Sequence, residues 1–111
     1  MIYSDEGSIL RQKLLFKLNK HDKYVQELYK KIHDRYDYLI LDYEIGKNKR
    51  TLGQIDLAGV KDGNMDLYEV KCSYRIHKAE KQLKRARKIM KSNGQLYFYC
   101  GSSGQIEEVI D

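Results

Sequence analysis

The sequence predicts an α/β fold in which helices flank a mixed central β-sheet. Asp62 and Gly63 form a strong hairpin signal between two segments of alternating apolar residues. An amphipathic helix follows, and another apolar strand comes after it. A hairpin joins antiparallel strands, whereas a strand–helix–strand crossover joins parallel ones, so the sheet should contain both kinds of pairing. The 111 residues suit a single domain, which we take as 1–111.

The elements follow from apolar spacing and local breaks. We expect helices over residues 8–18, 23–33 and 76–91, strands over 36–45, 95–100 and 106–110, a basic loop over 46–50 and a hairpin over 52–72. Asp22 is the expected N-cap of the helix over 23–33, and Gly94 the expected residue just beyond the helix over 76–91.

The hairpin turn fixes a strand register. Counting back from Asp62 and Gly63 places Asp56 opposite Glu69 and Gln54 opposite Lys71. Because strand side chains alternate, one face should carry Gln54, Asp56, Leu67, Glu69 and Lys71. The other face should carry Ile55, Leu57, Tyr68 and Val70, a good core surface.

The charged face of this hairpin points to metal chemistry. Two carboxylates with Cβ atoms roughly 5 Å apart repel each other unless a cation or a proton lies between them. Asp56 and Glu69, with the amine of Lys71 beside them, therefore suit a divalent metal and an activated water. The alternative is a hairpin face whose charges are merely solvated. Phosphodiester hydrolysis is the chemistry that this set of residues favours.

Composition and charge indicate the kind of binding partner and the expected location of the protein. The net charge is +5, and residues 75–91 concentrate Lys and Arg around one acid, Glu80. This basic stripe favours a polyanionic partner, with nucleic acid first and a solvated helix face as the alternative. No apolar run is long enough for a membrane span and no signal-peptide pattern is present, so we expect a cytoplasmic location and no membrane contact. Cys72 and Cys100 are expected as reduced core residues.

The residues resemble the PD-(D/E)xK nuclease superfamily over about residues 23–100. The likeness lies in Gln54-Ile55-Asp56-Leu57, in Glu69-Val70-Lys71 on the next strand, and in a basic helix that contains Gln82. Ile55 stands where the family name gives proline. The resemblance implies an αβββαβ restriction-endonuclease-like core, and the chain is most similar to small archaeal Holliday junction resolvases.

The resemblance also implies roles. Asp56, Glu69 and the backbone carbonyl of Val70 would hold Mg²⁺, with Mn²⁺ as a substitute, and Lys71 would stabilise the transition state. Gln82 would hydrogen-bond the site or the scissile phosphate. A further acid is expected from the N-terminal helix: Glu27 is preferred, with Glu6 and Glu44 as the alternatives.

The expected function is a metal-dependent DNA endonuclease, either structure-selective, for instance on Holliday junctions, or non-specific. Symmetric junction cleavage requires a homodimer. Two alternatives are a nuclease-fold protein that binds nucleic acid without cleaving it and a small basic interaction protein of another fold. The expected phosphate contacts are Lys49, Arg50, Lys78, Lys81, Lys84, Arg85, Arg87 and Lys88.

Overall fold

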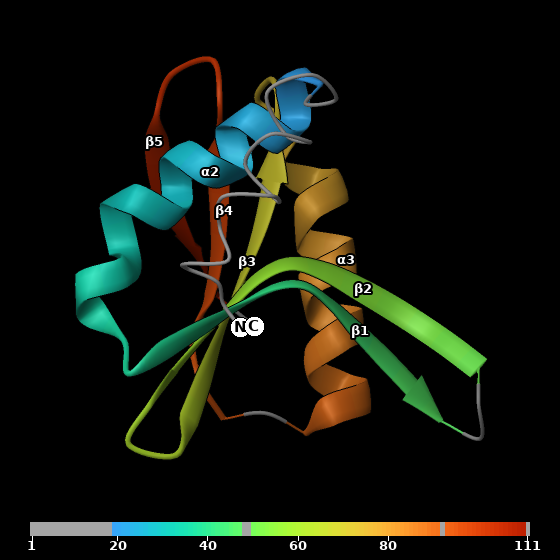
Figure 1. The fold of residues 1–111 in the computed structure, drawn as a ribbon. Coiled ribbons are helices and arrows are strands. Elements are labelled where there is room, and N and C mark those ends of the chain that lie inside the picture. Colours follow the sequence, from blue (N-terminus) through green and yellow to red (C-terminus); the bar gives the residue numbers. More distant parts are fainter. Residues whose placement is uncertain (1–18, 48–49, 92, 111) are drawn as a thin grey trace.

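The computed structural model describes residues 19–47, 50–91 and 93–110 (Figure 1). The described elements are α2 (Lys20–Ile32), the short 3₁₀ helix η1 (His33–Arg35), β1 (Tyr38–Lys47), β2 (Arg50–Lys61), β3 (Asn64–Lys71), α3 (Ile76–Met90), β4 (Leu96–Cys100) and β5 (Gln105–Val109). The expected α/β class is confirmed. The helix expected over residues 8–18 lies outside the described residues.

The five strands form one mixed sheet in the order β1-β2-β3-β4-β5. The pairs β1/β2, β2/β3 and β4/β5 are antiparallel, and β3/β4 is parallel. Helix α3 is the crossover that makes this parallel pair possible, because it carries the chain from one end of β3 back to the start of β4. The expected mixture of pairings is therefore confirmed.

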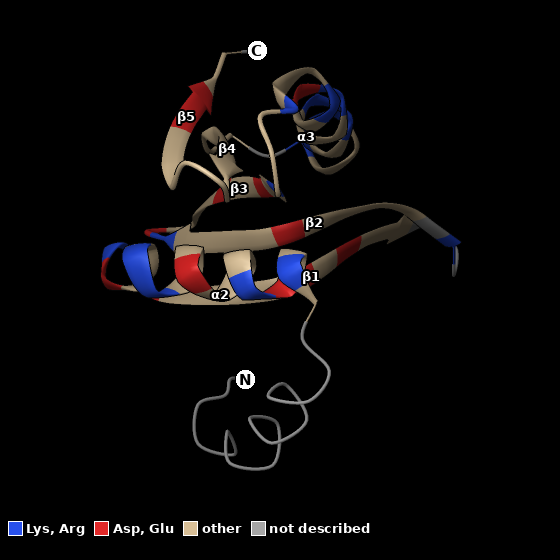
Figure 2. Cartoon of the chain, turned by 90° about the horizontal axis from the view of Figure 1, so that it is seen from above, with Lys and Arg blue, Asp and Glu red and all other residues tan. Residues whose placement is uncertain are grey.

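One helix covers each face of the sheet (Figure 1, Figure 2). Leu28 and Ile32 of α2 pack with a cluster that includes Tyr68 and Val70 of β3. The buried side of α3 packs on the opposite cluster, which consists of Ala79, Leu83 and Ala86 of the helix with Ile45, Ile55, Ala58, Leu67, Leu96, Phe98, Cys100 and Val109. Since Glu69 alternates with Val70, it falls on the α3 side, and it is only 4% exposed. The face expected to be polar is thus covered by a helix.

Several expected boundaries are wrong by one to three residues; the strand expected over 36–45, for example, is β1 (Tyr38–Lys47). Helix α2 begins at Lys20, because the side chain of Asn19 caps it by accepting a hydrogen bond from the backbone N–H of Asp22 at 2.8 Å. The left-handed residue that follows α3 is its C-cap, Lys91 (φ 55°), and not the expected Gly94. The basic loop is shorter than residues 46–50, because Lys47 and Arg50 pair in the β1/β2 ladder.

The hairpin turn has the expected conformation, with positive φ at Asp62 (51°) and Gly63 (80°). The predicted register is confirmed from the turn as far as Leu57, which pairs with Tyr68. The expected pairs Asp56–Glu69 and Gln54–Lys71 are wrong, because the ladder between β2 and β3 ends at Leu57 and Tyr68. Beyond that point β2 leaves β3.

A bend in the β1/β2 ribbon accounts for this separation (Figure 1). Asp42, which lies between the paired residues Leu41 and Tyr43, has a left-handed backbone (φ 54°), and its side chain accepts a 2.9 Å hydrogen bond from Gln54. Past the bend, Ile55 packs in the α3 cluster while Leu57 packs in the α2 cluster. The expectation that these two residues share a face is wrong, since regular alternation is interrupted at the bend.

Within the described part of the chain, no helix has the length and apolar character needed to cross a membrane. Cys72 is half-buried and Cys100 is buried, and both thiols are free.

Candidate active site

Asp56 lies where β2 departs from β3, and its side chain replaces the missing backbone partner. The carboxylate oxygen Oδ2 accepts a hydrogen bond from the backbone N–H of Val70 at 2.9 Å. The side chain is 16% exposed, so it sits just below the surface. The separation of the two strands therefore creates a niche in which a carboxylate reaches the edge of β3.

His21, in the first turn of α2, reaches the same niche. Its Nε2 lies 3.2 Å from Oδ2 of Asp56 and 3.1 Å from the carbonyl oxygen of Val70. Burial lowers the pKa of His21, but the Asp56 charge and the hydrogen bonds to Asp56, Asp22 and Val70 outweigh it, and the net shift is upward from 6.5. The niche therefore favours a positive charge between the two oxygen atoms.

Glu69 supplies a second, deeper carboxylate. Its Oε2 lies 3.3 Å from Nζ of Lys71, whose side chain is 16% exposed. Its Oε1 is buried and has no hydrogen-bond partner among the described residues. Burial, followed by the charge of Asp56, raises the pKa of Glu69 to about 7, while Lys71 acts in the opposite direction. A buried oxygen without a donor is costly, so it marks a place where a cation or water would stabilise the site.

The carboxylate and carbonyl oxygen atoms at this site are of the kind that a hard cation such as Mg²⁺ prefers. Asp56 Oδ2 and the Val70 carbonyl oxygen each lie within hydrogen-bonding distance of His21 Nε2, at 3.2 and 3.1 Å. In the described ranges, no three His, Cys, Asp or Glu side chains are grouped closely enough to hold a metal. Any ion here would depend on the Val70 carbonyl and on waters, which Mg²⁺ retains.

For the other expected site residues, the described part of the structure gives no hydrogen bond or ion pair with Asp56 or Glu69. Gln82 on α3 is half-buried, and its Oε1 has no hydrogen-bond partner among the described residues. Glu27 is exposed and accepts a 3.1 Å hydrogen bond from the hydroxyl of Tyr99 on β4. Burial and this bond to Glu27 raise the pKa of Tyr99 to about 12. Glu44 is exposed on β1, opposite Gln54, and Glu6 lies outside the described residues.

The helix residue that contacts Asp56 is therefore His21, which sequence reasoning did not select. A single histidine in a helix carries no pattern, and its approach to Val70, 49 positions away, depends on how α2 crosses the sheet. The one local signal was its position in the first turn of α2, and recognising that position required Asn19 to be identified as the N-cap.

Basic residues are concentrated along α3 (Figure 2). The exposed cations of this helix are Lys78, Lys81, Lys84, Arg85 and Lys88. Arg87 differs from them, because it is half-buried and its guanidinium donates to the carbonyl of Gly94, which ties the end of the helix to the following segment. Arg50 is exposed at the far end of the β1/β2 ribbon, and Lys49 lies outside the described residues.

Comparison with known proteins identifies no relative: the chain matches no family model, no curated protein and no solved structure. The assignment of a function therefore depends on the geometry of the site.

Proposed function

We propose that this protein is a metal-dependent nuclease that hydrolyses phosphodiester bonds in DNA. One observation carries the proposal. The Asp56 carboxylate and the Val70 carbonyl oxygen both lie within hydrogen-bonding distance of one atom, Nε2 of His21. Beside them, buried Glu69 keeps one oxygen without a donor from the described residues. Such a set of oxygen atoms next to a lysine suits cleavage of a phosphate ester.

The order of elements supports the restriction-endonuclease-like core that the sequence resemblance implies. A helix, three antiparallel strands, a second helix and a strand parallel to β3 follow one another in the described chain. Asp56 and the Glu69-Val70-Lys71 segment lie on its second and third strands. The resemblance implies metal-binding acids at these positions.

The residues that would hold Mg²⁺ are Asp56, Glu69 and the carbonyl of Val70, with the imidazole of His21 as a nitrogen ligand. When bound, the ion supplies Lewis acidity and lowers the pKa of a coordinated water. As a ligand, His21 would have to be deprotonated, so its present hydrogen bond to Asp56 would not coexist with a bound ion.

Lys71 supplies fixed positive charge at the reacting phosphate. Its ion pair with Glu69, at 3.3 Å, holds the ammonium group at the edge of the site, where 16% of the side chain remains accessible. A preorganised cation placed where negative charge develops stabilises the transition state more than the ground state. We assign Lys71 this electrostatic role and not that of a general base.

The outer face of α3 would track the phosphate backbone of the substrate. Its exposed lysines provide charge but no base-reading geometry, so cleavage is structure-selective or non-specific. Paired cleavage of a Holliday junction would require a homodimer.

The decisive experiment is Mg²⁺-dependent cleavage of a panel of four-way junction, flap, single-stranded and duplex DNA. Asp56→Ala and Glu69→Ala should each abolish cleavage and leave the fold intact. Asp34→Ala is the matched control, because its side chain is 90% exposed and pairs only with His33 among the described residues. Near wild-type cleavage by either site variant would refute the proposed metal site.

A second candidate is a nuclease-fold protein that binds nucleic acid without cleaving it. It is favoured by the finding that no three metal-ligating side chains group together in the described residues. Isothermal titration with Mg²⁺ and Mn²⁺ separates the two candidates. A protein that binds DNA but neither ion would support the second.

A further inference from the structure

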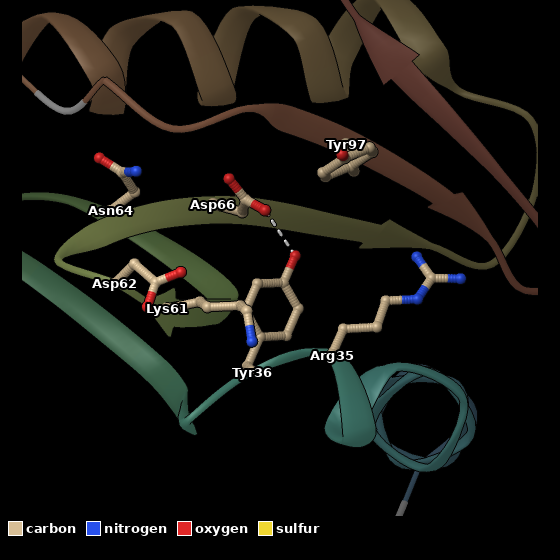
Figure 3. Close-up of a pocket in the computed structure, with 7 residues that line it drawn as sticks. All are labelled: Arg35, Tyr36, Lys61, Asp62, Asn64, Asp66 and Tyr97. Carbon is tan, nitrogen blue, oxygen red and sulfur yellow. Dashed lines mark hydrogen bonds between the residues drawn. The ribbon is translucent and has the colours of Figure 1, made fainter.

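A pocket of about 330 Å³ lies on the sheet well away from Asp56 (Figure 3). Its lining residues are Arg35, Tyr36, Lys61, Asp62, Asn64, Asp66 and Tyr97. Asp66 and Val70 are four positions apart on β3, which corresponds to about 13 Å. The pocket and the candidate active site are therefore two separate places along the same strand.

The floor of the pocket is built from internal hydrogen bonds. The hydroxyl of Tyr36 donates to Oδ2 of Asp66 at 2.6 Å and lies 2.7 Å from the hydroxyl of Tyr68. The backbone N–H of Gln95 donates to Oδ1 of Asp66 at 2.7 Å. Both oxygen atoms of Asp66 thus have internal donors. Its carboxylate fixes the shape of the pocket and does not remain free to bind a cation.

The lack of a side chain at Gly59 on β2 helps to keep this shape. A Cβ atom on Gly59 would come within 2.7 Å of the Tyr36 ring, so the ring lies directly against the strand. The Tyr36 ring is therefore held in place before any ligand arrives, and binding would lose no conformational entropy at this wall of the pocket.

The rim offers an aromatic surface and free cations. Tyr97 stacks on Tyr68 with ring centroids 4.8 Å apart and remains half-buried at the pocket. Within the described chain, neither Arg35 nor Lys61 forms an ion pair. Figure 3 shows Arg35 and Tyr97 at one end of the pocket and Asn64 with Asp62 at the other. This arrangement combines a flat apolar wall, positive charge and an amide.

We propose that this pocket binds one unpaired nucleotide, with its base against Tyr97 and the phosphates on its two sides toward Arg35 at one end and Lys61 at the other. Proteins that hold unpaired bases combine aromatic stacking with backbone-tracking cations in this way. A phosphate alone would leave the aromatic wall unused. The inference rests on the proposed function and deepens it, because it makes the substrate a DNA with an unpaired segment.

Binding in EDTA tests the pocket without any cleavage. Fluorescence anisotropy would compare a short single-stranded DNA with a blunt duplex of the same sequence. Tyr97→Leu should weaken single-strand binding about tenfold and leave duplex binding unchanged, since it removes one aromatic surface for base stacking. Tyr97→Phe should keep the affinity. Tyr74→Leu is the matched control, because Tyr74 is 57% exposed and packs on Phe98, outside the pocket.

Arg35→Gln provides a second variant on an exposed residue, where the risk to folding is small. It should reduce the salt dependence of single-strand binding by about one phosphate contact. The proposal is overturned if Arg35→Gln and Tyr97→Leu each keep the wild-type affinity for single-stranded DNA. If Tyr97→Leu does not fold, Lys61→Gln takes its place in this comparison. Because no metal is present, the result is independent of whether the candidate active site cleaves DNA.

Discussion

The imidazole of His21 lies 3.2 Å from the carboxylate of Asp56, although the two residues are 35 positions apart in the sequence. The contact links the start of α2 to the point where β2 leaves β3. Because the same nitrogen also lies 3.1 Å from the carbonyl of Val70, His21 places a hydrogen-bond donor between two oxygen atoms, and its raised pKa favours the protonated form. Metal-free protein thereby satisfies two acceptors that would otherwise face each other in a half-buried niche.

We predict that metal-free protein loses stability as the pH rises from about 4 to 8. The pKa of Glu69 is raised from 4.5 to about 7, so the folded state keeps a proton that the unfolded state has released. At 1.36 kcal/mol per pKa unit, the free energy of unfolding should fall by about 3 kcal/mol over this range. The raised pKa of His21 acts in the same direction, because the stability that it contributes is present at pH 6.5 and below and is lost at higher pH.

Denaturant unfolding in EDTA at several pH values provides the measurement. Glu69→Gln should remove most of this slope, whatever its effect on stability at a single pH. Mg²⁺ added at pH 8 should stabilise the wild type, since a ligand that binds only the folded state raises its stability, and should stabilise the Gln variant much less. Equal slopes in the two proteins would contradict the raised pKa.

Lys71→Ala should abolish cleavage and leave DNA affinity unchanged. One ammonium group adds little to a surface with many phosphate contacts, but it is the cation paired with Glu69 at the site. Single-turnover cleavage and anisotropy with the same DNA separate the two effects. Parallel reductions in binding and cleavage would make Lys71 an ordinary phosphate contact.

The salt dependence of DNA binding should report on the outer face of α3. Changing Lys81 and Lys84 to Gln should reduce the slope of log affinity against log salt by about one for each phosphate that the helix no longer neutralises. Both side chains are exposed, whereas Arg87 is engaged at the end of the helix and is a poor choice for this test. Changing Lys30 and Lys31 of α2, which are also exposed, to Gln is the charge-matched control. An unchanged slope in the Lys81 and Lys84 variant would mean that α3 faces away from DNA.

Local patterns predicted most of the fold. Asp62 and Gly63 set the hairpin register correctly as far as Leu57, since positive φ at both positions determines how the two strands face each other. The amphipathic helix expected over residues 76–91 is confirmed as α3, whose buried side carries Ala79, Leu83 and Ala86. Such patterns act between residues a few positions apart, and they remain valid wherever the backbone is regular.

The same reasoning failed where the backbone is irregular. The left-handed conformation of Asp42 bends the β1/β2 ribbon. An aspartate within a strand pattern does not by itself predict a left-handed backbone. Strict alternation therefore placed Asp56 opposite Glu69, whereas its carboxylate is bound to the N–H of Val70. The burial of Glu69 also depended on the packing of α3 against the sheet, which a strand pattern does not contain. Residue chemistry indicated which residues belong to the candidate site, but their relative positions follow from the tertiary structure.

The last prediction compares His21 with Glu27 as the helix residue that serves the site. Glu27 is bound by the hydroxyl of Tyr99, whereas His21 contacts both Asp56 and Val70. His21→Ala should therefore cost at least tenfold in the cleavage rate, which is about 1.4 kcal/mol, and should weaken Mn²⁺ binding. Glu27→Gln should retain nearly the wild-type rate. Calorimetric Mn²⁺ titration beside single-turnover cleavage distinguishes a ligand from a residue that merely holds α2 in place, because a purely structural change would lower stability without a matching loss of metal affinity. If Glu27→Gln proves slow and His21→Ala normal, the acid expected from the N-terminal helix is Glu27 after all, and His21 serves only to neutralise Asp56 in the metal-free protein.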